Sequence, residues 1–422
     1  MNKGDKMKKT KSNVKEVKKA TDVKKLMKEK FEKFNKNEFK TIEVIFLIVI
    51  TAIISLIVGY LLNNKNSLKT DSHIEEIIEN YNYIVDNFYD SVDKDKLVSG
   101  AISGMSDALG DDYSKLLEQD NNSTFYINLE GTYEGIGVEI VNDEDNNIIV
   151  VGTIDNSPAE IAGIQTGDII KKIDDKDFTN TTVSELSKYI KNTNNENYKI
   201  IIERDSKEIT IEVKKDIVTI KSVLSKVIEK NNKKIGYIYI SVFANATISQ
   251  FDDALEELER EDIDGLIIDV RNNSGGHLTT AYSIVSNFLD SSKVVYQIKK
   301  DNKTTKYYSL GSKTKKYPIV VIQNGSSASA SEFLSSALKE SYGAKIVGTT
   351  SYGKGTVQEV VALKNGDTYK LTTKKWLTPK GNSIDGVGVK PDIEVELSEN
   401  YTNSPSDDTD DQLQAAINSL LK

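Results

Sequence analysis

Hydrophobic and polar residues follow four different patterns along the chain. Residues 44–62 form an uninterrupted apolar run, and from residue 71 to about residue 117 apolar positions recur at helical spacing. From about residue 126 to 215 short alternating strands surround one helical stretch, and from about 218 to 397 apolar strands and helices alternate. These patterns predict a single transmembrane helix, an N-terminal helical region, a mainly β domain and an α/β core whose sheet is buried on both faces.

The apolar run Val44–Leu62 contains 19 residues without a charge. At about 1.5 Å per residue, such a helix approaches the hydrocarbon thickness of a bilayer, roughly 30 Å. Seven Lys precede the run within 20 residues and two follow it, so the positive-inside rule places the N-terminus in the cytoplasm. No small-residue cleavage site follows. We expect a single-pass signal anchor in the cell membrane with the remaining chain extracytoplasmic; the alternative is a buried core helix.

Charge and pattern together divide the chain into six regions. We expect a Lys-rich cytoplasmic arm (1–42), the anchor (43–62), a helical region (63–125), a β domain (126–217), a core (218–400), and a linker with a C-terminal helix (401–422). The arm holds 15 Lys against six acids, which beside a membrane segment indicates contact with anionic lipid rather than nucleic acid. The amphipathic C-terminal helix predicts a docking or dimerisation element, and hence a possible homo-oligomer.

The composition restricts the chemistry that the chain can perform. The sequence has a net charge of -9, no Cys, and only two His, at positions 73 and 277. A thiolate nucleophile and a Cys-ligated metal are excluded, and a multi-histidine metal site is not expected. We expect no metal and no cofactor. Hydrolytic chemistry would have to use Ser, Thr, Asp, Glu or Lys.

The β domain contains two informative segments. In the first, Gly135, Ile136, Gly137 and Val138 form a loop that runs directly into a strand. Consecutive N–H groups in such a loop bind a peptide carboxylate, while the exposed strand edge pairs with the peptide. In the second, Ser157–Ile164 places Pro and Gly around one helical turn before another strand.

A Ser-rich segment, Gly325–Glu332, lies where an apolar strand turns into a helix. A Ser at that turn is held at the helix N-terminus, where free N–H groups and the helix dipole favour negative charge. Small neighbouring residues leave room for a substrate. The alternative interpretation is a Ser-rich helix cap, and this segment alone does not distinguish the two.

A second segment, Thr350–Gln358, places Lys354 between two glycines at the start of a strand. On a strand Lys354, Thr356 and Gln358 share one face, so the Gln358 amide is expected to orient the Lys354 amine. Burial lowers the pKa of a Lys and favours the neutral form that acts as a base. A Ser paired with this Lys would supply the nucleophile and the base.

The third segment, Asp269–Leu278, carries paired glycines after a strand. An N–H at Gly275 or Gly276, together with the N–H of Ala330, is expected to form an oxyanion hole. Arg271 is expected to pair with a carboxylate and to organise this loop.

These three segments, in this order after the β domain, resemble the carboxy-terminal processing peptidases. The sequences DVRNNSGG, SASASE and GKGTVQ carry the resemblance, which covers about residues 71–397, and the SPAE..AG...GD pattern resembles a bacterial PDZ domain. The resemblance implies a crotonase-like core with Ser329 as nucleophile, Lys354 as base and Gln358 as its partner. The sequence departs from the family where NNSGGHL has Ser274 in place of the usual Pro.

The resemblance implies a serine endopeptidase with a Ser-Lys dyad. Its PDZ domain would bind protein substrates through a free, probably apolar C-terminus, and cleavage would proceed through an acyl-enzyme. Two alternatives remain open. NNSGGHL also resembles the nucleophile loop of trypsin-like proteases, which would make Ser274 the nucleophile. Alternatively, the chain is an inactive PDZ scaffold that only binds peptides.

Overall fold

The computed structural model describes residues 49–55, 72–117, 119–311, 317–364 and 366–422. The chain divides into two compact units, residues 1–97 and 98–422. The Lys-rich arm and most of the predicted anchor lie outside the described residues. Within the described residues no helix is both long enough and apolar enough to span a membrane.

The first unit contains helix α3 (Ser72–Asn87) and the beginning of α4 (Lys94–Asp107). The helical spacing predicted from residue 71 onward is confirmed here. The apolar side chains of α3 are exposed, among them Ile74, Ile77 and Ile78. This helix is therefore amphipathic but contributes no buried residue.

The helical region also contains a strand that the apolar pattern did not predict. Strand β1 (Lys115–Leu117) pairs antiparallel with β18 (Thr368–Leu377), and α5 (Gln119–Glu130) follows it. Three residues are too few to show a period of two, so only the pairing with β18 makes them a strand. The segment before α5 thus belongs to a sheet of the core.

The predicted β domain forms a six-stranded antiparallel sheet with its own hydrophobic core. Its elements are β3 (Val138–Asn142), β4 (Ile148–Thr153), α6 (Pro158–Ile161), β5 (Ile169–Ile173), β6 (Lys176–Asp177), α7 (Val183–Asn192), β7 (Asn197–Arg204) and β8 (Lys207–Lys214). Strands β2 (Thr132–Gly135) and β9 (Asp216–Thr219) pair with each other where the chain enters and leaves the domain. The short α6 starts as predicted, with Ser157 as its cap and Pro158 at its first position.

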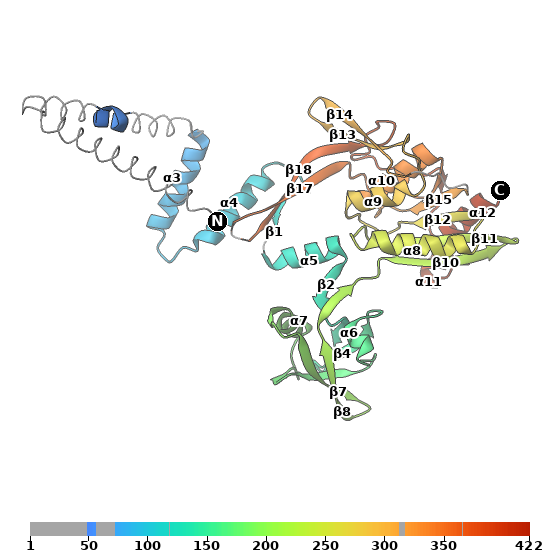
Figure 1. Cartoon of the computed structure of the whole chain (residues 1–422), viewed down its shortest axis with the longest axis horizontal. Coiled ribbons are helices and arrows are strands. Elements are labelled where there is room, and N and C mark those ends of the chain that lie inside the picture. The colour runs from blue at the N-terminus through green and yellow to red at the C-terminus, as the bar shows by residue number, and fades with distance from the viewer. Residues whose placement is uncertain (1–48, 56–71, 118, 312–316, 365) are drawn as a thin grey trace, which may run out of the picture. The chain divides into compact units, whose positions relative to one another are not determined.

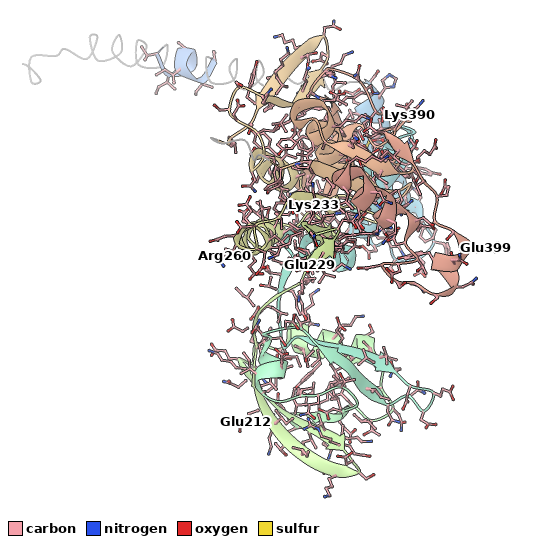
Figure 2. All side chains as sticks on the ribbon, turned by 90° about the vertical axis from the view of Figure 1, so that its right-hand side faces the viewer. Glu212, Glu229, Lys233, Arg260, Lys390 and Glu399 are labelled. Atoms are coloured by element: carbon pink, nitrogen blue, oxygen red, sulfur yellow. The ribbon has the colours of Figure 1, made fainter. Side chains whose placement is uncertain are left out.

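The core is built on a six-stranded sheet in the order β10-β11-β12-β15-β16-β19 (Figure 1). Only β10 runs antiparallel to its neighbour. The strands are β10 (Val223–Lys230), β11 (Lys233–Ile240), β12 (Gly265–Asp269), β15 (Ile319–Gln323), β16 (Lys345–Gly348) and β19 (Ile393–Glu394). The hairpin between β10 and β11 turns at Asn231 and Asn232, which both have positive φ, between Lys230 and Lys233, and Lys233 is labelled in Figure 2.

Both faces of this sheet are covered, as the continuous apolar strands predicted. One face packs against helices α8 (Thr247–Arg260), α9 (Leu278–Ser286) and α10 (Ala330–Ala337). The other face packs against α12 (Asp411–Leu421), whose Leu413 and Ile417 join the same buried cluster as Ile267 and Val320. Every residue of β12 and of β15 is consequently buried.

The position of α12 corrects the prediction for the C-terminal helix. Its apolar face packs on the chain's own sheet, so this helix completes the core rather than standing apart as a docking element. The periodic pattern of 411–421 showed an apolar face but not its partner. A short helix, α11 (Glu399–Asn403), precedes it.

A second sheet carries the order β1-β18-β13-β14, with β17 paired to β18. Its remaining strands are β13 (Val294–Lys300), β14 (Lys303–Tyr308) and β17 (Thr356–Ala362), and a π-helical turn, Leu338–Tyr342, extends α10. Trp376 of β18 is buried against Phe333 of α10, with ring centroids 5.9 Å apart. This contact attaches the second sheet to the helix that follows Ser329.

Candidate active site

The three predicted segments lie at one edge of the core sheet. Strands β12, β15 and β16 are adjacent and parallel, so their carboxyl ends face the same way. The glycine loop follows β12, the Ser-rich turn follows β15, and the segment with Lys354 follows β16. This edge is where open α/β sheets place their sites.

Ser329 occupies the turn between β15 and α10 in a strained backbone conformation. It precedes the first residue of the helix and has φ 54° and ψ -110°. A positive φ is uncommon for a residue with a side chain, and such strain collects at functional turns. Ser329 therefore stands at the helix N-terminus in the way a nucleophile turn requires.

The neighbouring serines are engaged in buried hydrogen bonds. The Ser327 hydroxyl donates to the Val270 carbonyl at 2.7 Å, and the Ser331 hydroxyl donates to the Asn273 carbonyl at 2.8 Å. Both side chains are fully buried, whereas Ser329 is half-buried. Of the three serines, Ser329 is the one a substrate can reach.

Glu332 connects the Ser-rich turn to the lysine segment. Its side chain is fully buried, and one oxygen, Oε2, accepts from the backbone N–H groups of both Ser329 and Lys354 at 2.8 Å. The other oxygen, Oε1, accepts from the Ser351 hydroxyl at 2.7 Å and from the Gly353 N–H at 2.5 Å. The backbone nitrogens of Ser329 and Lys354 are thus held by one shared atom.

The role of Glu332 was missed in the sequence. Its spacing from Ser329, three residues, is that of a capping box, in which the Glu accepts from the N-cap N–H. That signal explains the bond to Ser329 but not the three bonds to the segment after β16.

Lys354 is half-buried, and its amine lies 4.5 Å from the centre of the Tyr113 ring. Burial lowers the pKa of this amine, the charges of Glu332 and Asp111 act in the opposite direction, and Lys115 lowers it further. The net direction is downward, toward the neutral form, as predicted. Among the described residues no hydrogen bond joins the Lys354 amine to the Ser329 hydroxyl.

Gln358 does not take the position predicted for it. Strand β17 begins only at Thr356, so Lys354 lies before the strand, and the register with β18 shifts beside Gln358, where Thr373 of β18 is left without a partner residue. The Gln358 amide donates to the hydroxyls of Thr356 at 2.9 Å and Thr372 at 3.1 Å. The predicted hydrogen bond from Gln358 to the Lys354 amine is absent from this part of the described structure.

The glycine loop lies directly against the nucleophile. A Cβ added at Gly275 would be 2.9 Å from the Ser329 Cβ, and one at Gly276 would be 2.3 Å from the Phe243 carbonyl oxygen. The φ angles are 113° at Gly275 and 137° at Gly276, which favour glycine. No larger residue fits at either position without displacing the loop.

Only part of the predicted oxyanion hole has free donors. The Gly275 N–H donates to the Asn273 side-chain oxygen at 2.8 Å, so Gly275 is engaged. Within the described residues the N–H groups of Gly276 and Ala330 have no recorded acceptor. These two therefore remain the candidates for binding an oxyanion.

Arg271 anchors the loop as predicted. Its guanidinium contacts Asp269 at 2.5 Å and Asp410 at 2.8 Å, and all three side chains are buried. The link to Asp410, the cap of α12, ties the loop after β12 to the C-terminal helix. His277 lies at the start of α9.

The glycine loop of the β domain lines a groove of about 520 Å³. Gly135, Ile136, Gly137 and Val138 line this groove together with Leu186 and Ile190 of α7. The carbonyls of Ile136 and Gly137 accept from Ala159 and Ile154, which holds the loop in place.

Comparisons with known proteins agree with these segments. The chain matches the family model for peptidase family S41 over residues 234–395, the model for the PDZ domain over 126–203, and that for the activating protease CtpB N-terminal domain over 59–121. It is 36% identical over 338 residues to carboxy-terminal processing protease CtpB of Bacillus subtilis (strain 168), covering 79% of this chain and 70% of that protein. The chain belongs to peptidase family S41.

Other members of this family match the chain over a similar length. Carboxy-terminal processing protease CtpA of the same organism is 33% identical over 381 residues, which cover 88% of this chain and 80% of that protein. A solved structure, the photosystem II D1 C-terminal processing protease, aligns with a TM-score of 0.45 at 24% identity and covers 76% of this chain and 92% of that one.

Membership of family S41 identifies the chain as a serine-type endopeptidase of the carboxy-terminal processing kind. The predicted PDZ domain is confirmed. The trypsin-like alternative with Ser274 belongs to another class of protease and is set aside, as is the inactive scaffold.

Proposed function

We propose that the chain is a membrane-anchored, extracytoplasmic endopeptidase that uses Ser329 and Lys354 as a catalytic dyad. The observation that carries the proposal is the shared contact of the two residues with Glu332 Oε2, at 2.8 Å from each backbone nitrogen. One buried carboxylate thereby fixes the nucleophile turn and the base segment relative to each other. Among the described residues of the three segments the one histidine is His277, which lies at the N-cap of α9 with its Nε2 buried and without a hydrogen-bond partner.

The dyad would act by proton transfer and nucleophilic attack. Neutral Lys354 takes the proton of the Ser329 hydroxyl while the oxygen attacks the peptide carbonyl carbon. The N–H groups of Ala330 and Gly276 stabilise the oxyanion of the tetrahedral intermediate. The Lys354 ammonium then protonates the leaving amine, which returns Lys354 to its neutral form. Neutral Lys354 next takes a proton from water, and the resulting hydroxide hydrolyses the acyl-enzyme. Substrate binding must bring the Lys354 amine within hydrogen-bonding distance of Ser329.

Substrate selection is assigned to the PDZ groove. The groove offers apolar side chains, including Ile136, Leu186 and Ile190, and within the described residues the N–H groups of Ile136 and Gly137 donate to no other group and can bind a terminal carboxylate. A protein substrate with an apolar, free C-terminus matches both features. Lys191 and Lys215 also line this groove, where the Lys215 amine pairs with Glu134 at 3.6 Å.

The proposed membrane anchor and the extracytoplasmic position of the catalytic part are inferred from the sequence. The run Val44–Leu62 is long enough to span a bilayer, and the Lys excess on its N-terminal side orients the catalytic part outward. Protease added to intact cells would digest residues 63–422 and spare the arm if this orientation is right.

The test of the dyad uses the full chain in detergent and a disordered protein ending in apolar residues. Ser329→Ala and Lys354→Ala should each abolish cleavage, and Ser274→Ala should leave it intact. Amidation of the substrate C-terminus should raise KM, because the PDZ groove loses its carboxylate. Cleavage that survives Lys354→Ala would refute the dyad, and cleavage indifferent to amidation would refute PDZ selection.

A further inference from the structure

The amine of Lys354 lies against an aromatic ring from outside the three catalytic segments. The ring belongs to Tyr113, in the segment between α4 and β1, and its centre is 4.5 Å from the amine nitrogen. An ammonium group at that distance above an aromatic face is attracted by the electrons of the ring. A part of the chain that precedes the PDZ domain therefore contacts the catalytic base directly.

The segment that carries this ring is held in place by the second sheet. Residues 115–117 form β1, which pairs with β18. The Thr372 N–H of β18 donates to the Ser114 hydroxyl at 2.9 Å, and that hydroxyl donates to the Asp111 carboxylate. Ser114 is buried and Tyr113 is half-buried. The ring is thus presented to Lys354 by an anchored segment, with its position fixed on both sides.

The contact with the ring opposes the work of Lys354 as a base. To act on Ser329, the amine must be neutral and must lie within hydrogen-bonding distance of the hydroxyl. In the described part of the chain the amine contacts the Tyr113 ring and makes no hydrogen bond to Ser329. The ring also favours the ammonium form, which has no lone pair to accept a proton. Both the position and the charge that the ring favours are those of an inactive base.

Charged groups from several elements also act on the Lys354 amine. Burial is the largest influence and lowers its pKa, the charges of Glu332 and Asp111 raise it, and Lys115 lowers it. On β18, the pKa of Lys370 is lowered to about 8, first by burial and then by the charge of Lys354. Because these influences act in opposite directions, a ring contact of modest strength changes the fraction of neutral amine at neutral pH.

Tyr113 itself stays uncharged while the base titrates. Its pKa is raised to about 12, first by burial and then by Tyr352, with Asp385 and Asp112 contributing further. Its effect on the Lys354 amine is therefore that of a neutral aromatic face and not that of a phenolate.

We propose that Tyr113 is a positioning residue that holds the Lys354 amine on its ring, away from the Ser329 hydroxyl, until a substrate is bound. The proposal rests on the proposed Ser–Lys dyad. Substrate binding moves the amine from the ring to Ser329, and the anchored segment 111–117 restrains the base in the free enzyme. Weakening the ring contact should consequently make the free enzyme more reactive.

Labelling of Ser329 by a small phosphonofluoridate tests the free enzyme, because this reagent requires no peptide in the PDZ groove. Its second-order rate constant is measured on the full-length protein from about pH 6 to about pH 10, and the rising limb reports the base. Tyr113→Leu removes the ring but keeps an apolar side chain. It should speed labelling about 2–5-fold at neutral pH and lower the midpoint of the limb by about 0.4–0.7 pH units.

Three companion variants identify the cause of the change. Tyr113→Phe keeps the ring and should change the rate and the midpoint less than half as much as Tyr113→Leu. Ser114→Ala removes the acceptor of the Thr372 N–H and loosens the segment, so it should change both in the same direction as Tyr113→Leu. Tyr126→Leu is the matched control, because Tyr126 is an exposed tyrosine of the neighbouring α5.

The outcomes separate this inference from the proposed dyad. If labelling of the wild-type protein has no rising limb, or if Lys354→Ala is labelled as fast, the dyad itself is wrong. With the dyad intact, a Tyr113→Leu rate at or below that of the wild type, or a limb moved to higher pH, overturns the proposal, since the ring would then shield the base from water. An equal change in Tyr113→Phe overturns it too, because the hydroxyl would be responsible. Should Tyr113→Leu fold poorly, Ser114→Ala decides, and labelling at the wild-type rate refutes the restraint.

Discussion

Replacing Glu332 with Gln should separate the two roles of its carboxylate. Gln has nearly the same shape, but one of its two terminal atoms is an NH₂ group that donates and cannot accept. In either orientation, two of the four donors that Glu332 now satisfies lose their acceptor: Ser329 and Lys354, or Ser351 and Gly353. These donors are held around a fully buried side chain.

The expected magnitude follows from that count. A buried donor left without an acceptor costs about 1–3 kcal/mol, so two such donors should lower the free energy of unfolding by about 2–6 kcal/mol. Loss of the shared anchor should also displace the nucleophile turn from the base segment. A displacement of about 1 Å in an active site lowers the rate about 10²-fold, and we expect a fall in kcat of that order.

Glu332→Gln should also shift the pH dependence of kcat/KM to lower pH. The Glu332 charge raises the pKa of Lys354, so its removal lowers that pKa further. The rising limb of kcat/KM should then shift to lower pH in Glu332→Gln, although kcat falls. Urea unfolding, kcat at saturating substrate and the pH profile measure the three effects, with Glu256→Gln, in an exposed ion pair of α8, as the control. Wild-type kcat with an unshifted limb would refute the reasoning.

Three further predictions concern the base, the loop and its anchor. Lys354→Arg should abolish cleavage at every pH below about 12, because a guanidinium stays protonated. The test is a cleavage assay together with labelling of Ser329 by an active-site-directed serine reagent. Gly275→Ala should lower kcat about 10²-fold without changing the circular dichroism spectrum, since its Cβ would press on the Ser329 side chain at 2.9 Å. Arg271→Met should lower the free energy of unfolding in urea by about 3–5 kcal/mol, because it leaves two buried carboxylates without their cation.

The sequence predicted the parts of the site that have local signals. Continuous apolar strands such as β12 and β15 identified a sheet buried on both faces, and this placed the following loops at one edge. The paired glycines and the Ser-rich turn were recognisable because backbone geometry demands particular residues there. Gly275 and Ser329 accordingly lie together in the structure, as expected.

Interactions that depend on irregular geometry were not predictable in the same way. The two-residue period of a strand predicted that Gln358 and Lys354 share a face, but β17 begins only at Thr356, after Lys354, and no residue signals that start in the sequence. Glu332 showed only its capping-box spacing. Its bonds to Ser351, Gly353 and Lys354 require β15 and β16 to be neighbours, and the positions of Ser329 and Glu332 in the chain do not reveal that.

One contribution to the electrostatics of the base, the charge of Lys115, comes from the most distant strand pairing in the described structure. Lys115 and Lys370 are 255 positions apart, and β1 exists only because β18 supplies its hydrogen bonds. Composition gave no reason to single out either residue among 52 Lys. A motif such as GKGTVQ therefore identifies where a base can stand, whereas the lowered pKa of Lys354 comes from burial and from charges that only the assembled fold brings around it. A chain that kept Ser329 and Lys354 but lost residues 113–117 would retain the motif and lose both the Tyr113 ring beside the amine and the Lys115 charge that lowers its pKa.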